Sequence, residues 1–405
     1  MSTNEASRLD RTALIFGASG ITGWAIVREA VQYPTPETFR RIIGLTNRPF
    51  DRNTSLLPDD NRIELVAGLD LSAGPEAVTA KLREVPGIEE VTDVFFAAYV
   101  QPPGTSDVEG WEQLKLANVD ILETAVAAVE SVSPNMRYWS LQTGGKAYGF
   151  AHAREIGPPA GPCHESDARI PQPYADMMFY YAQHDALVRL SSGKKWRFAE
   201  IRPNDVVGFV PTGSNAMNIA QSLGIFLAFY AWQKRKAAKS ASEPITVQFP
   251  GPVASFKALN TETSQKTLAR GHLFASSHDA ANGDIINVAD TASTSWAQKW
   301  TALCAYFGLV GLAPDEGAEH LRAVEFMQAH QAQWADFERE NGLKPGLIGG
   351  SGWEFMQIIL ELVVFDRVYD LSKANSAGFK EKEDIVQMYL EVFDLMKATK
   401  MLPQK

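Results

Sequence analysis

The chain has 405 residues, a formal net charge of −10 and a hydrophobic fraction of 45%. This length and apolar content suffice for one large α/β unit with a second lobe, or for two domains of moderate size. The acidic balance argues against a nucleic-acid-binding protein, which normally presents a basic patch. The two cysteines, Cys163 and Cys304, form neither a metal-binding spacing nor a disulfide framework, so we expect no bound metal and a reducing compartment.

Two stretches bear on targeting and membranes. The first residues, MSTNEASRLDR, lack the basic region and apolar run of a signal peptide, so we expect a cytoplasmic protein. The apolar stretch Ala216–Trp232 contains Asn218, Gln221 and Ser222 and is shorter than the ~20 mostly apolar residues of a membrane span. We favour a buried helix and no membrane span there; a surface helix near a membrane is the alternative.

In the first half of the chain, apolar runs rich in β-branched residues alternate with segments of helical periodicity. Such alternation implies βαβ units and a doubly wound parallel sheet. The expected strands are Thr12–Phe16, Arg41–Thr46, Ile63–Ala67, Asp93–Ala97, Met136–Gln142 and Trp196–Ile201. The expected helices are Ile21–Val31, Glu76–Leu82, Trp111–Val129 and Tyr180–Leu190.

The pattern changes after Pro211. Residues 214–240 have an apolar helical pattern, and PITVQFPG and GDIINVAD are typical of short strands. Amphipathic helices are expected at 295–307, 317–340, 353–371 and 380–399. We therefore expect an α/β domain over residues 1–212, with a returning segment near 284–300, and a mostly helical lobe over residues 213–405.

The sequence GASGITG at residues 17–23 follows the first expected strand and opens the first expected helix. In that context G-x-x-G-x-x-G is typical of a turn that binds the pyrophosphate of a dinucleotide. Glycine allows the turn dihedrals and lets phosphate approach the backbone, and the positive end of the helix faces the phosphates. We expect a Rossmann-type domain; a tight corner without a ligand is the alternative. The expected contacts are Gly17, Ser19, Gly20, Ile21, Thr22 and Gly23.

The end of the second expected strand indicates which dinucleotide is bound. A carboxylate there would accept hydrogen bonds from a ribose 2′-hydroxyl and favour NAD. The sequence has Asn47 and Arg48 instead. A guanidinium can bind a 2′-phosphate through two charge-assisted hydrogen bonds. We therefore predict NADPH as the cofactor; a solvated surface arginine is the alternative.

The ends of the next two strands predict further cofactor contacts. Asp70 and Leu71 follow the third strand, where Asp70 would reach the exocyclic amine of adenine; a helix cap is an equal alternative for Asp70. Ala97 ends the fourth strand and Tyr99 lies just beyond it, and both would lie near the nicotinamide ribose.

Short-chain reductases usually carry Tyr-x-x-x-Lys on one helix, but here His184 follows Tyr180 by four residues. A lysine occurs instead in LQTGGKAYG, just past the fifth strand. LQTGGKAYG resembles the L-Q-T-G-x-K-H-Y motif of the progesterone 5β-reductase / iridoid synthase-like (PRISE) family, and FYYAQHD resembles its N-F-Y-Y-x-x-E-D. GASGITG, TNRPF, TDVFFAAY, IRPNDVVGFVP, TVQFPG and NVAD fall in the family's order, so the resemblance extends over nearly the whole chain.

The resemblance implies an atypical short-chain reductase that uses NADPH and reduces the double bond of an enone or enal by 1,4-addition. It assigns the role of the missing helix lysine to Lys146 and that of the catalytic tyrosine to Tyr180, with Tyr181 as second choice; Thr143 of the same motif would contact the cofactor. A phenol O–H stabilises negative charge on the carbonyl oxygen, and a nearby ammonium favours the phenolate and orients the ribose. From spacing alone, Lys146 is equally well an ordinary loop lysine, and the tyrosines are equally well core aromatics.

The chain departs from the family pattern at three positions. Ala147 stands where the family has histidine, Met178 where it has asparagine, and His184 where it has glutamate. These changes put the substrate in question more than the cofactor. His184 is either a second titrating group or, as we favour, a partly exposed helix histidine.

The segment IRPNDVVGFVP follows the sixth strand. It resembles the R-P-x-x-[VI]-x-G segment whose backbone lies along the nicotinamide in short-chain reductases. Pro203, Asn204 and Val206 are the contacts expected there; a simple loop is the alternative.

The helical lobe would line the pocket of a small apolar carbonyl substrate of terpenoid or polyketide type, although its aromatic residues are more often core than pocket. The predicted function is therefore NADPH-dependent enone or enal reduction. One alternative is a carbonyl reductase or alcohol dehydrogenase on the same scaffold, since both additions place charge on the same oxygen. Another is a non-redox NADPH-binding regulator, cyclase or isomerase. A homodimer is left open.

Overall fold

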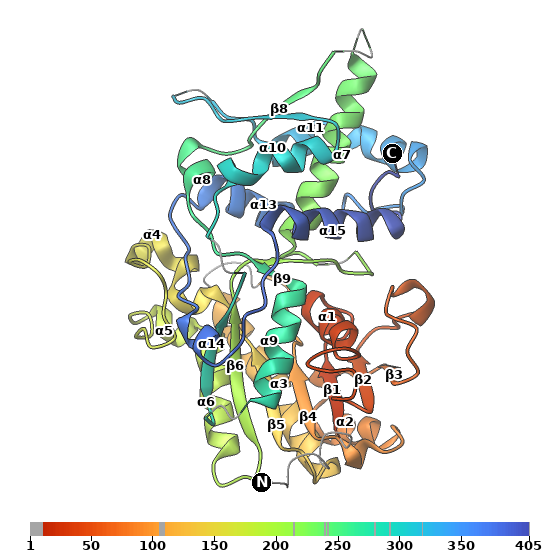
Figure 1. The fold of residues 1–405 in the computed structure, drawn as a ribbon, viewed down its shortest axis with the longest axis vertical. Coiled ribbons are helices and arrows are strands. Elements are labelled where there is room, and N and C mark those ends of the chain that lie inside the picture. The colour runs from red at the N-terminus through yellow and green to blue at the C-terminus, as the bar shows by residue number, and fades with distance from the viewer. Residues whose placement is uncertain are drawn as a thin grey trace. The chain divides into compact units, whose positions relative to one another are not determined.

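The chain forms two compact units in the computed structural model (Figure 1). The first unit contains Met1–Asn204, Lys266–Val288 and Asp370–Glu381, and the second contains Asp205–Gln265, Ala289–Tyr369 and Lys382–Lys405. The first unit is thus completed by two segments that return from the second half of the sequence. The structure describes residues 11–104, 110–213, 215–238, 240, 243–278, 281–290, 293–317 and 319–404.

A seven-stranded parallel sheet forms the centre of the first unit, with strand order β10-β6-β5-β4-β1-β2-β3. Because β1 pairs with both β2 and β4, the direction of winding reverses there, and in open α/β sheets ligands bind at the carboxyl ends of strands at such a point. The doubly wound Rossmann fold expected from the sequence is confirmed. The strands are β1 Thr12–Phe16, β2 Arg41–Thr46, β3 Ile63–Ala67, β4 Asp93–Phe96, β5 Tyr138–Gln142, β6 Arg197–Pro203 and β10 Asp284–Val288.

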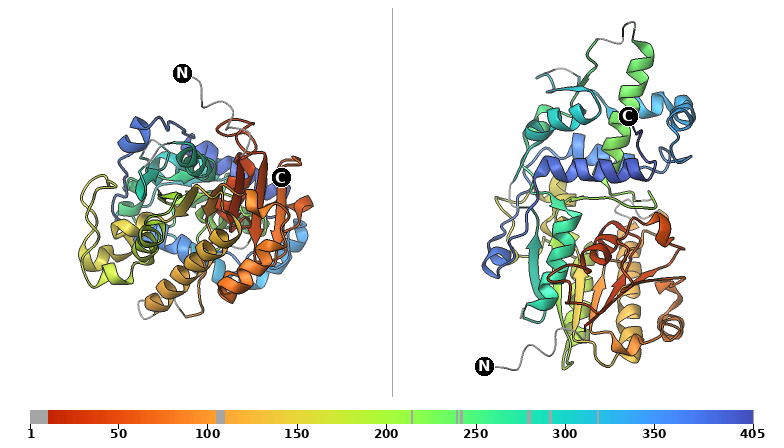
Figure 2. Two further views of the ribbon diagram at one scale, coloured as in Figure 1. Left: turned by 90° about the horizontal axis from the view of Figure 1, so that it is seen from below. Right: turned by 45° about the vertical axis from the view of Figure 1, so that its right-hand side comes forward.

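Helices cover both faces of this sheet (Figure 2). On one face α3 (Trp111–Val132) contacts both α2 (Pro75–Arg83) and α6 (Phe179–Ser191). On the other, α1 (Ile21–Glu29) and α9 (Gln265–Ser277) are joined by an ion pair between Glu29 and Arg270. The main core lies between the sheet and the layer of α2, α3 and α6, where Phe16 and Phe96 pack on each other and both stack on Trp139.

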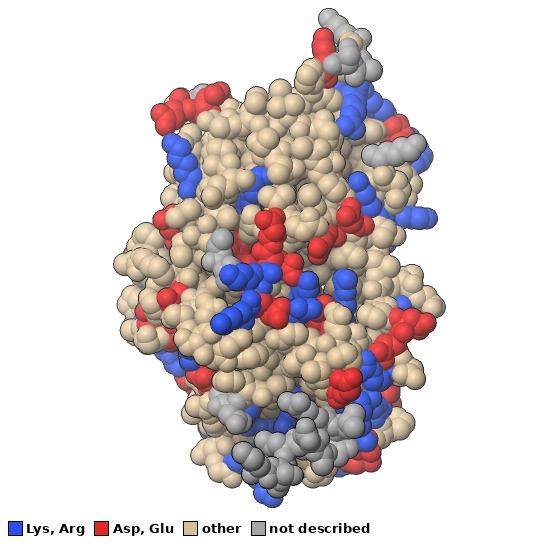
Figure 3. Space-filling view, in the orientation of Figure 1, with Lys and Arg blue, Asp and Glu red and all other residues tan. Residues whose placement is uncertain are grey.

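Short elements of the first unit lie in its connections. They are the 3₁₀ turns η2 Arg52–Thr54, η3 Leu71–Ala73, η4 Ile88–Glu90, η6 Gly145–Tyr148 and η7 Phe150–His152, and the helices α4 Ala153–Ile156, α5 Tyr174–Met177 and α14 Ser372–Ser376. On the face shown in Figure 3, lysine and arginine side chains lie among aspartate and glutamate side chains over the described residues.

The second unit is largely helical and is organised on α7 (Ile219–Ala237), whose residues 219–231 are all buried. This agrees with the buried helix favoured for Ala216–Trp232, and no helix in the described part of the chain is long and apolar enough to cross a membrane. The remaining elements are β7 Val206–Val207, β8 Thr246–Gln248, α8 Val253–Lys257, β9 Thr263–Ser264, α10 Trp296–Tyr306, β11 Val310–Leu312, α11 Ala323–Ala329, η8 Gln331–Gln333, α12 Trp334–Glu340, α13 Trp353–Gln357, η9 Ile358–Leu362 and α15 Ile385–Ala398.

Two helical predictions for this unit are wrong in extent. The segment 317–340 contains two short helices separated by a 3₁₀ turn, α11 and α12, and not one helix. The segment 353–371 is helical only to Leu362, its last turn being a π-helix. Beyond it the backbone bonds elsewhere, because the Arg367 amide donates to Leu259 and the Arg367 carbonyl accepts from Thr261. The β-branched Val363 and Val364 also favour extended backbone.

Candidate active site

The glycine turn lies at the carboxyl end of β1, and its three glycines have different roles. Gly17 has φ of +80°, and a β-carbon there would lie 2.7 Å from the Ala97 carbonyl oxygen. A β-carbon on Gly23 would lie 2.2 Å from the Gly17 carbonyl oxygen, so Gly23 permits the close packing expected of it. At Gly20 a β-carbon would contact only the Gly17 carbonyl oxygen, at 3.3 Å. The protein itself therefore leaves space above Gly20.

The amino terminus of α1 opens directly onto this space. No side chain caps it, no acidic residue occupies its first turn, and its first α-helical bond runs from the Trp24 amide to the Gly20 carbonyl. The first amides of a helix have no partner within the helix. The Thr22 hydroxyl is buried and has no hydrogen-bond partner among the residues that the structure describes. Uncapped amides, a buried unpartnered hydroxyl and open space fit a bound pyrophosphate, and the half-buried Ser19 and Ile21 border the same turn.

The predicted NADPH determinants follow β2. Asn47 and Arg48 are both exposed, and the Arg48 carbonyl accepts a hydrogen bond from the Thr46 hydroxyl at 2.7 Å. Among the described residues, none pairs with the Arg48 guanidinium. Its side chain is therefore available to a 2′-phosphate.

Asp70 forms the helix cap that the sequence left as an alternative to adenine binding. Its Oδ1 accepts hydrogen bonds from the amide and hydroxyl of Ser72, at 3.0 and 2.7 Å, at the start of η3. These hydrogen bonds from Ser72 lower the pKa of Asp70. The adenine contact of Asp70 and of its half-buried neighbour Leu71 stays a prediction.

The predicted catalytic residues come from two neighbouring segments. Tyr180 is the second residue of α6, and Lys146 lies in η6 beyond β5. A β-carbon built on Gly144 would lie 3.3 Å from the Tyr180 hydroxyl oxygen, so the phenol reaches the turn that carries Lys146. Both side chains are half-buried, and no described residue hydrogen-bonds the hydroxyl or the ammonium. Burial raises the pKa of Tyr180 and lowers that of Lys146.

The hydroxyl of Tyr181, the second choice for the catalytic tyrosine, is hydrogen-bonded to the backbone on both sides. Its hydroxyl donates to the Ala147 carbonyl and accepts from the Ile170 amide at 3.1 Å. Arg169 lies over its ring, 4.7 Å from the centroid. Because this hydroxyl is already occupied on both sides, the geometry favours Tyr180 over Tyr181.

Further predicted contacts surround Gly144 and Gly145. A β-carbon on Gly144 would lie 3.5 Å from the Pro203 carbonyl oxygen, and one on Gly145 would lie 3.0 Å from Asn204 Oδ1.

Tyr99, beyond β4, packs its ring on Phe179 with centroids 5.9 Å apart and hydrogen-bonds Gln101. Burial raises the pKa of Tyr99 to about 12.

Not every predicted contact lies in the first unit. Ala97 lies against Gly17 at the end of β4, and Thr143 is buried beyond β5. Val206, in contrast, belongs to the second unit, where it pairs with Thr263 of β9. The structure therefore brings all the predicted contacts except Val206 to one unit.

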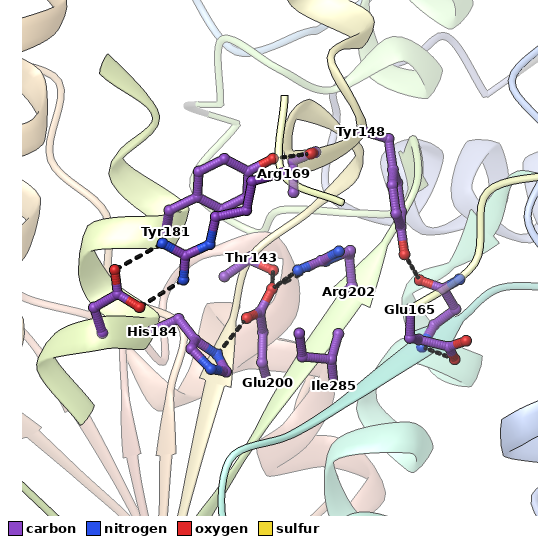
Figure 4. Close-up of polar contacts among 12 residues, drawn as sticks. Thr143, Tyr148, Glu165, Arg169, Tyr181, His184, Glu200, Arg202 and Ile285 are labelled. Carbon is purple, nitrogen blue, oxygen red and sulfur yellow. Dashed lines mark hydrogen bonds and ion pairs between the residues drawn. The ribbon is translucent and has the colours of Figure 1, made fainter. Parts of the chain in front are cut away.

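A buried polar network beneath these residues was missed by the sequence analysis (Figure 4). Glu200 of β6 is 1% exposed. Its Oε1 accepts hydrogen bonds from the Thr143 hydroxyl at 2.6 Å and from Arg202 Nη2 at 2.7 Å, and its Oε2 accepts one from His184 Nδ1 at 2.8 Å. Burial alone would raise the pKa of Glu200, but Arg202, His184 and Thr143 lower it to about 2. The sequence signal that could have revealed this network is a pair of charged residues, Glu200 and Arg202, two positions apart in a buried strand.

His184 lies on α6 and is partly exposed, as expected, but the sequence analysis did not predict its carboxylate partner. Its side chain is 13% exposed and paired with Glu200, because α6 turns this residue toward β6. The aromatic residues of α7 also belong to a core: Phe226 and Phe229 are fully buried and pack on Phe326. Cys163 and Cys304 are buried and unpaired, and the described residues include no group of three metal-ligating side chains.

Comparison with known proteins identifies the family. Residues 13–403 match the model of the PRISE-like Rossmann-fold domain. The chain is 34% identical to the short chain dehydrogenase ausT of Aspergillus calidoustus, over 98% of this chain and 95% of that one. It is 25% identical to the 3-oxo-Δ(4,5)-steroid 5β-reductase of Arabidopsis thaliana (97% and 94%) and 24% identical to the (S)-8-oxocitronellyl enol synthase of Nepeta cataria (99% and 95%).

Solved structures show the same fold. The UDP-glucose 4-epimerase of Thermotoga maritima has a TM-score of 0.61 at 13% identity, with 96% of this chain and 99% of that one covered. The resemblance noted in the motifs is thus confirmed over nearly the whole chain. The protein belongs to the PRISE-like family of Rossmann-fold short-chain dehydrogenases and reductases.

Proposed function

We propose that the protein is an NADPH-dependent reductase of the activated carbon–carbon double bond in a small apolar enone or enal. Two relatives support this choice by name: one is a 5β-reductase of a 3-oxo-Δ(4,5)-steroid and the other an enol synthase. Both names connect a carbonyl group with chemistry at the adjacent carbons.

The observation that carries the proposal is the position of the Tyr180 hydroxyl. It lies beside Gly144 and has no hydrogen-bond partner among the described residues, whereas the Tyr181 hydroxyl has two. When a hydride adds to the β-carbon of an enone, negative charge develops on the carbonyl oxygen. A positioned phenol donor stabilises that charge in the transition state. The raised pKa of Tyr180 keeps the phenol protonated and able to donate.

Lys146 supports the same assignment. Its ammonium is half-buried without a carboxylate partner in the described structure. We infer that it binds the hydroxyls of the nicotinamide ribose and favours negative charge near Tyr180. The lowered pKa reflects the cost of burying this charge without a partner.

The cofactor proposal rests on the turn at Gly17–Gly23 and on Arg48. The helix amides and Thr22 would bind the pyrophosphate, and the unpaired Arg48 would bind the 2′-phosphate. Bound NADPH would supply the hydride. Asn204, 7% exposed at the end of β6, would fix the carboxamide of the nicotinamide.

Product analysis with labelled cofactor tests the proposal. The enzyme is incubated with small apolar enones and NADPH that carries deuterium at the transferable position, and products are analysed by NMR. We expect deuterium at the β-carbon and an intact carbonyl. Deuterium at the carbonyl carbon would show a carbonyl reductase instead. Tight NADPH binding without oxidation by any enone would show a non-redox protein.

A further inference from the structure

The carboxylate of Glu200 joins the three segments on which the proposed chemistry depends. Glu200 lies on β6, His184 on α6 and Thr143 directly after β5. Both carboxylate oxygens are used, because Oε1 accepts from Thr143 and Arg202 and Oε2 accepts from His184. These are buried, charge-assisted hydrogen bonds, which fix geometry more strongly than neutral or exposed ones.

The turn that carries Lys146 is held at both ends by this network. Thr143 precedes the turn and donates to Glu200. Tyr148 ends it and lies over the Arg202 guanidinium, 4.8 Å from the ring centroid, while its hydroxyl donates to Asn287 Oδ1 at 2.7 Å. Figure 4 shows Arg202 between the Glu200 carboxylate and the Tyr148 ring. The position of the Lys146 backbone thus depends on the Glu200–Arg202 pair.

His184 attaches α6, the helix that carries Tyr180, to the Glu200 carboxylate. It lies four residues after Tyr180 on α6, one helical turn away on the same face. Its Nδ1–H donates to Glu200 at 2.8 Å, and its ring packs edge-on against Phe198 of β6. Two other hydrogen bonds hold α6. The Tyr181 hydroxyl donates to the Ala147 carbonyl, and the Gln183 side-chain amide donates to the Asn118 carbonyl. His184 provides the hydrogen bond that fixes this helix to β6.

We propose that His184 is a positioning residue: its hydrogen bond to Glu200 sets the distance between the Tyr180 hydroxyl and the Gly144–Lys146 turn. His184 itself touches neither substrate nor cofactor in this account. The inference deepens the proposed function and rests on it for its catalytic consequence, but the placement of the Tyr180 ring can be measured without turnover.

Two substitutions at His184 separate the hydrogen bond from the bulk of the side chain. His184→Asn places an amide N–H close to the position of Nδ1, whereas His184→Leu removes the donor and keeps an apolar side chain. Because a displacement of about 1 Å can cost about a hundredfold in rate, we expect His184→Leu to lower kcat by roughly tenfold or more. We expect His184→Asn to restore most of the wild-type kcat. The dissociation constant for NADPH should stay at the wild-type value in both variants.

Asp185→Asn is the matched control, because Asp185 lies next to His184 and forms an exposed ion pair with Arg169. Exposed pairs contribute little, so its kcat should equal that of the wild type. A turnover-independent readout uses protein labelled with ¹³C at the tyrosine ring, in complex with NADPH. The Tyr180 resonance is assigned by its loss in Tyr180→Phe.

The proposal expects a shifted Tyr180 resonance and reduced kcat in His184→Leu, with both recovered in His184→Asn. A Tyr180 resonance in His184→Leu at the wild-type position would overturn it, as would equal losses of kcat in both variants. A lower melting temperature of His184→Leu with wild-type kcat would show a purely structural role and would also overturn it. If the wild type reduces no enone, the proposed function fails, and the resonance alone decides the positioning role.

Discussion

Replacing Gly20 with alanine separates cofactor binding from folding more cleanly than any other change in the glycine turn. Gly20 has φ of −86° and ψ of 173°, dihedrals that alanine also adopts, and its β-carbon would meet only the Gly17 carbonyl oxygen at 3.3 Å. Because glycine is a somewhat better N-cap than alanine, the free energy of unfolding should fall by only about 0.5–1 kcal/mol. For a chain of 405 residues, that corresponds to a melting-temperature decrease of roughly 1 °C.

The same methyl group would occupy the space through which the pyrophosphate approaches the helix amides. Losing one charge-assisted hydrogen bond costs about 2 kcal/mol, which raises the dissociation constant for NADPH about 30-fold. The measurement is a fluorescence titration with NADPH together with thermal unfolding of the protein without cofactor.

Gly23→Ala is the matched control, since its β-carbon would lie 2.2 Å from the Gly17 carbonyl oxygen. It should lower the free energy of unfolding by about 3 kcal/mol or more, because both overlapping groups are backbone. If Gly20→Ala binds NADPH as tightly as the wild type, the pyrophosphate does not lie over Gly20 and the cofactor placement is wrong.

Three further changes test single residues of the site. Arg48→Ala should raise the dissociation constant for NADPH about tenfold and leave that for NADH unchanged, because only NADPH carries the 2′-phosphate; equal effects in the two titrations would contradict this. Tyr181→Phe removes two hydrogen bonds and should lower the free energy of unfolding by about 1–3 kcal/mol in denaturant titrations, with NADPH affinity retained; a loss of turnover at full stability would instead give Tyr181 the catalytic role. Burial lowers the pKa of Lys146 and favours its neutral form, so kcat should decline as pH rises, at a pH below the ordinary lysine pKa of about 10.4. Lys146→Arg should move that decline to higher pH, and an unchanged pH profile would exclude Lys146 as its source.

Much of the first unit could be predicted because its local signals agree with its tertiary structure. The strands β1, β2 and β3 have the predicted bounds, since each is a short apolar run that ends at a turn. The glycine turn was found for the same reason: its glycines are required by φ and by backbone overlap, which the spacing reveals. In these segments the local sequence preference agrees with the structure that the segment adopts in the folded protein.

The second unit was predicted less well because long-range pairing overrides local periodicity. Residues 363–371 have apolar spacing compatible with a helix, yet their backbone pairs with Leu259 and Thr261, more than a hundred residues away in the sequence. No local pattern encodes that pairing. The helix α9 also returns to the first unit, and its ion pair with Glu29 joins residues 241 positions apart.

In the candidate site, too, residues marked by a local motif were predicted, and residues that depend on long-range contacts were not. Lys146 and Tyr180 were predicted through motifs, but Glu200 and Arg202 were not, because Glu200 lay in an expected apolar strand, Trp196–Ile201, that ended before Arg202. Two charges at i and i+2 of a buried strand face the same side and require buried partners. That reasoning would have predicted a polar network beneath the site and a partner such as His184.

The most direct measurement of the central claim is the turnover number of Tyr180→Phe with an accepted enone and saturating NADPH. Phenylalanine keeps the packing of the ring on Phe179 and removes only the hydroxyl beside Gly144. Because the loss of one oxyanion donor costs about 10²–10³ in kcat, we predict a decrease of that size with unchanged NADPH affinity. A Tyr180→Phe enzyme with wild-type kcat would contradict the account.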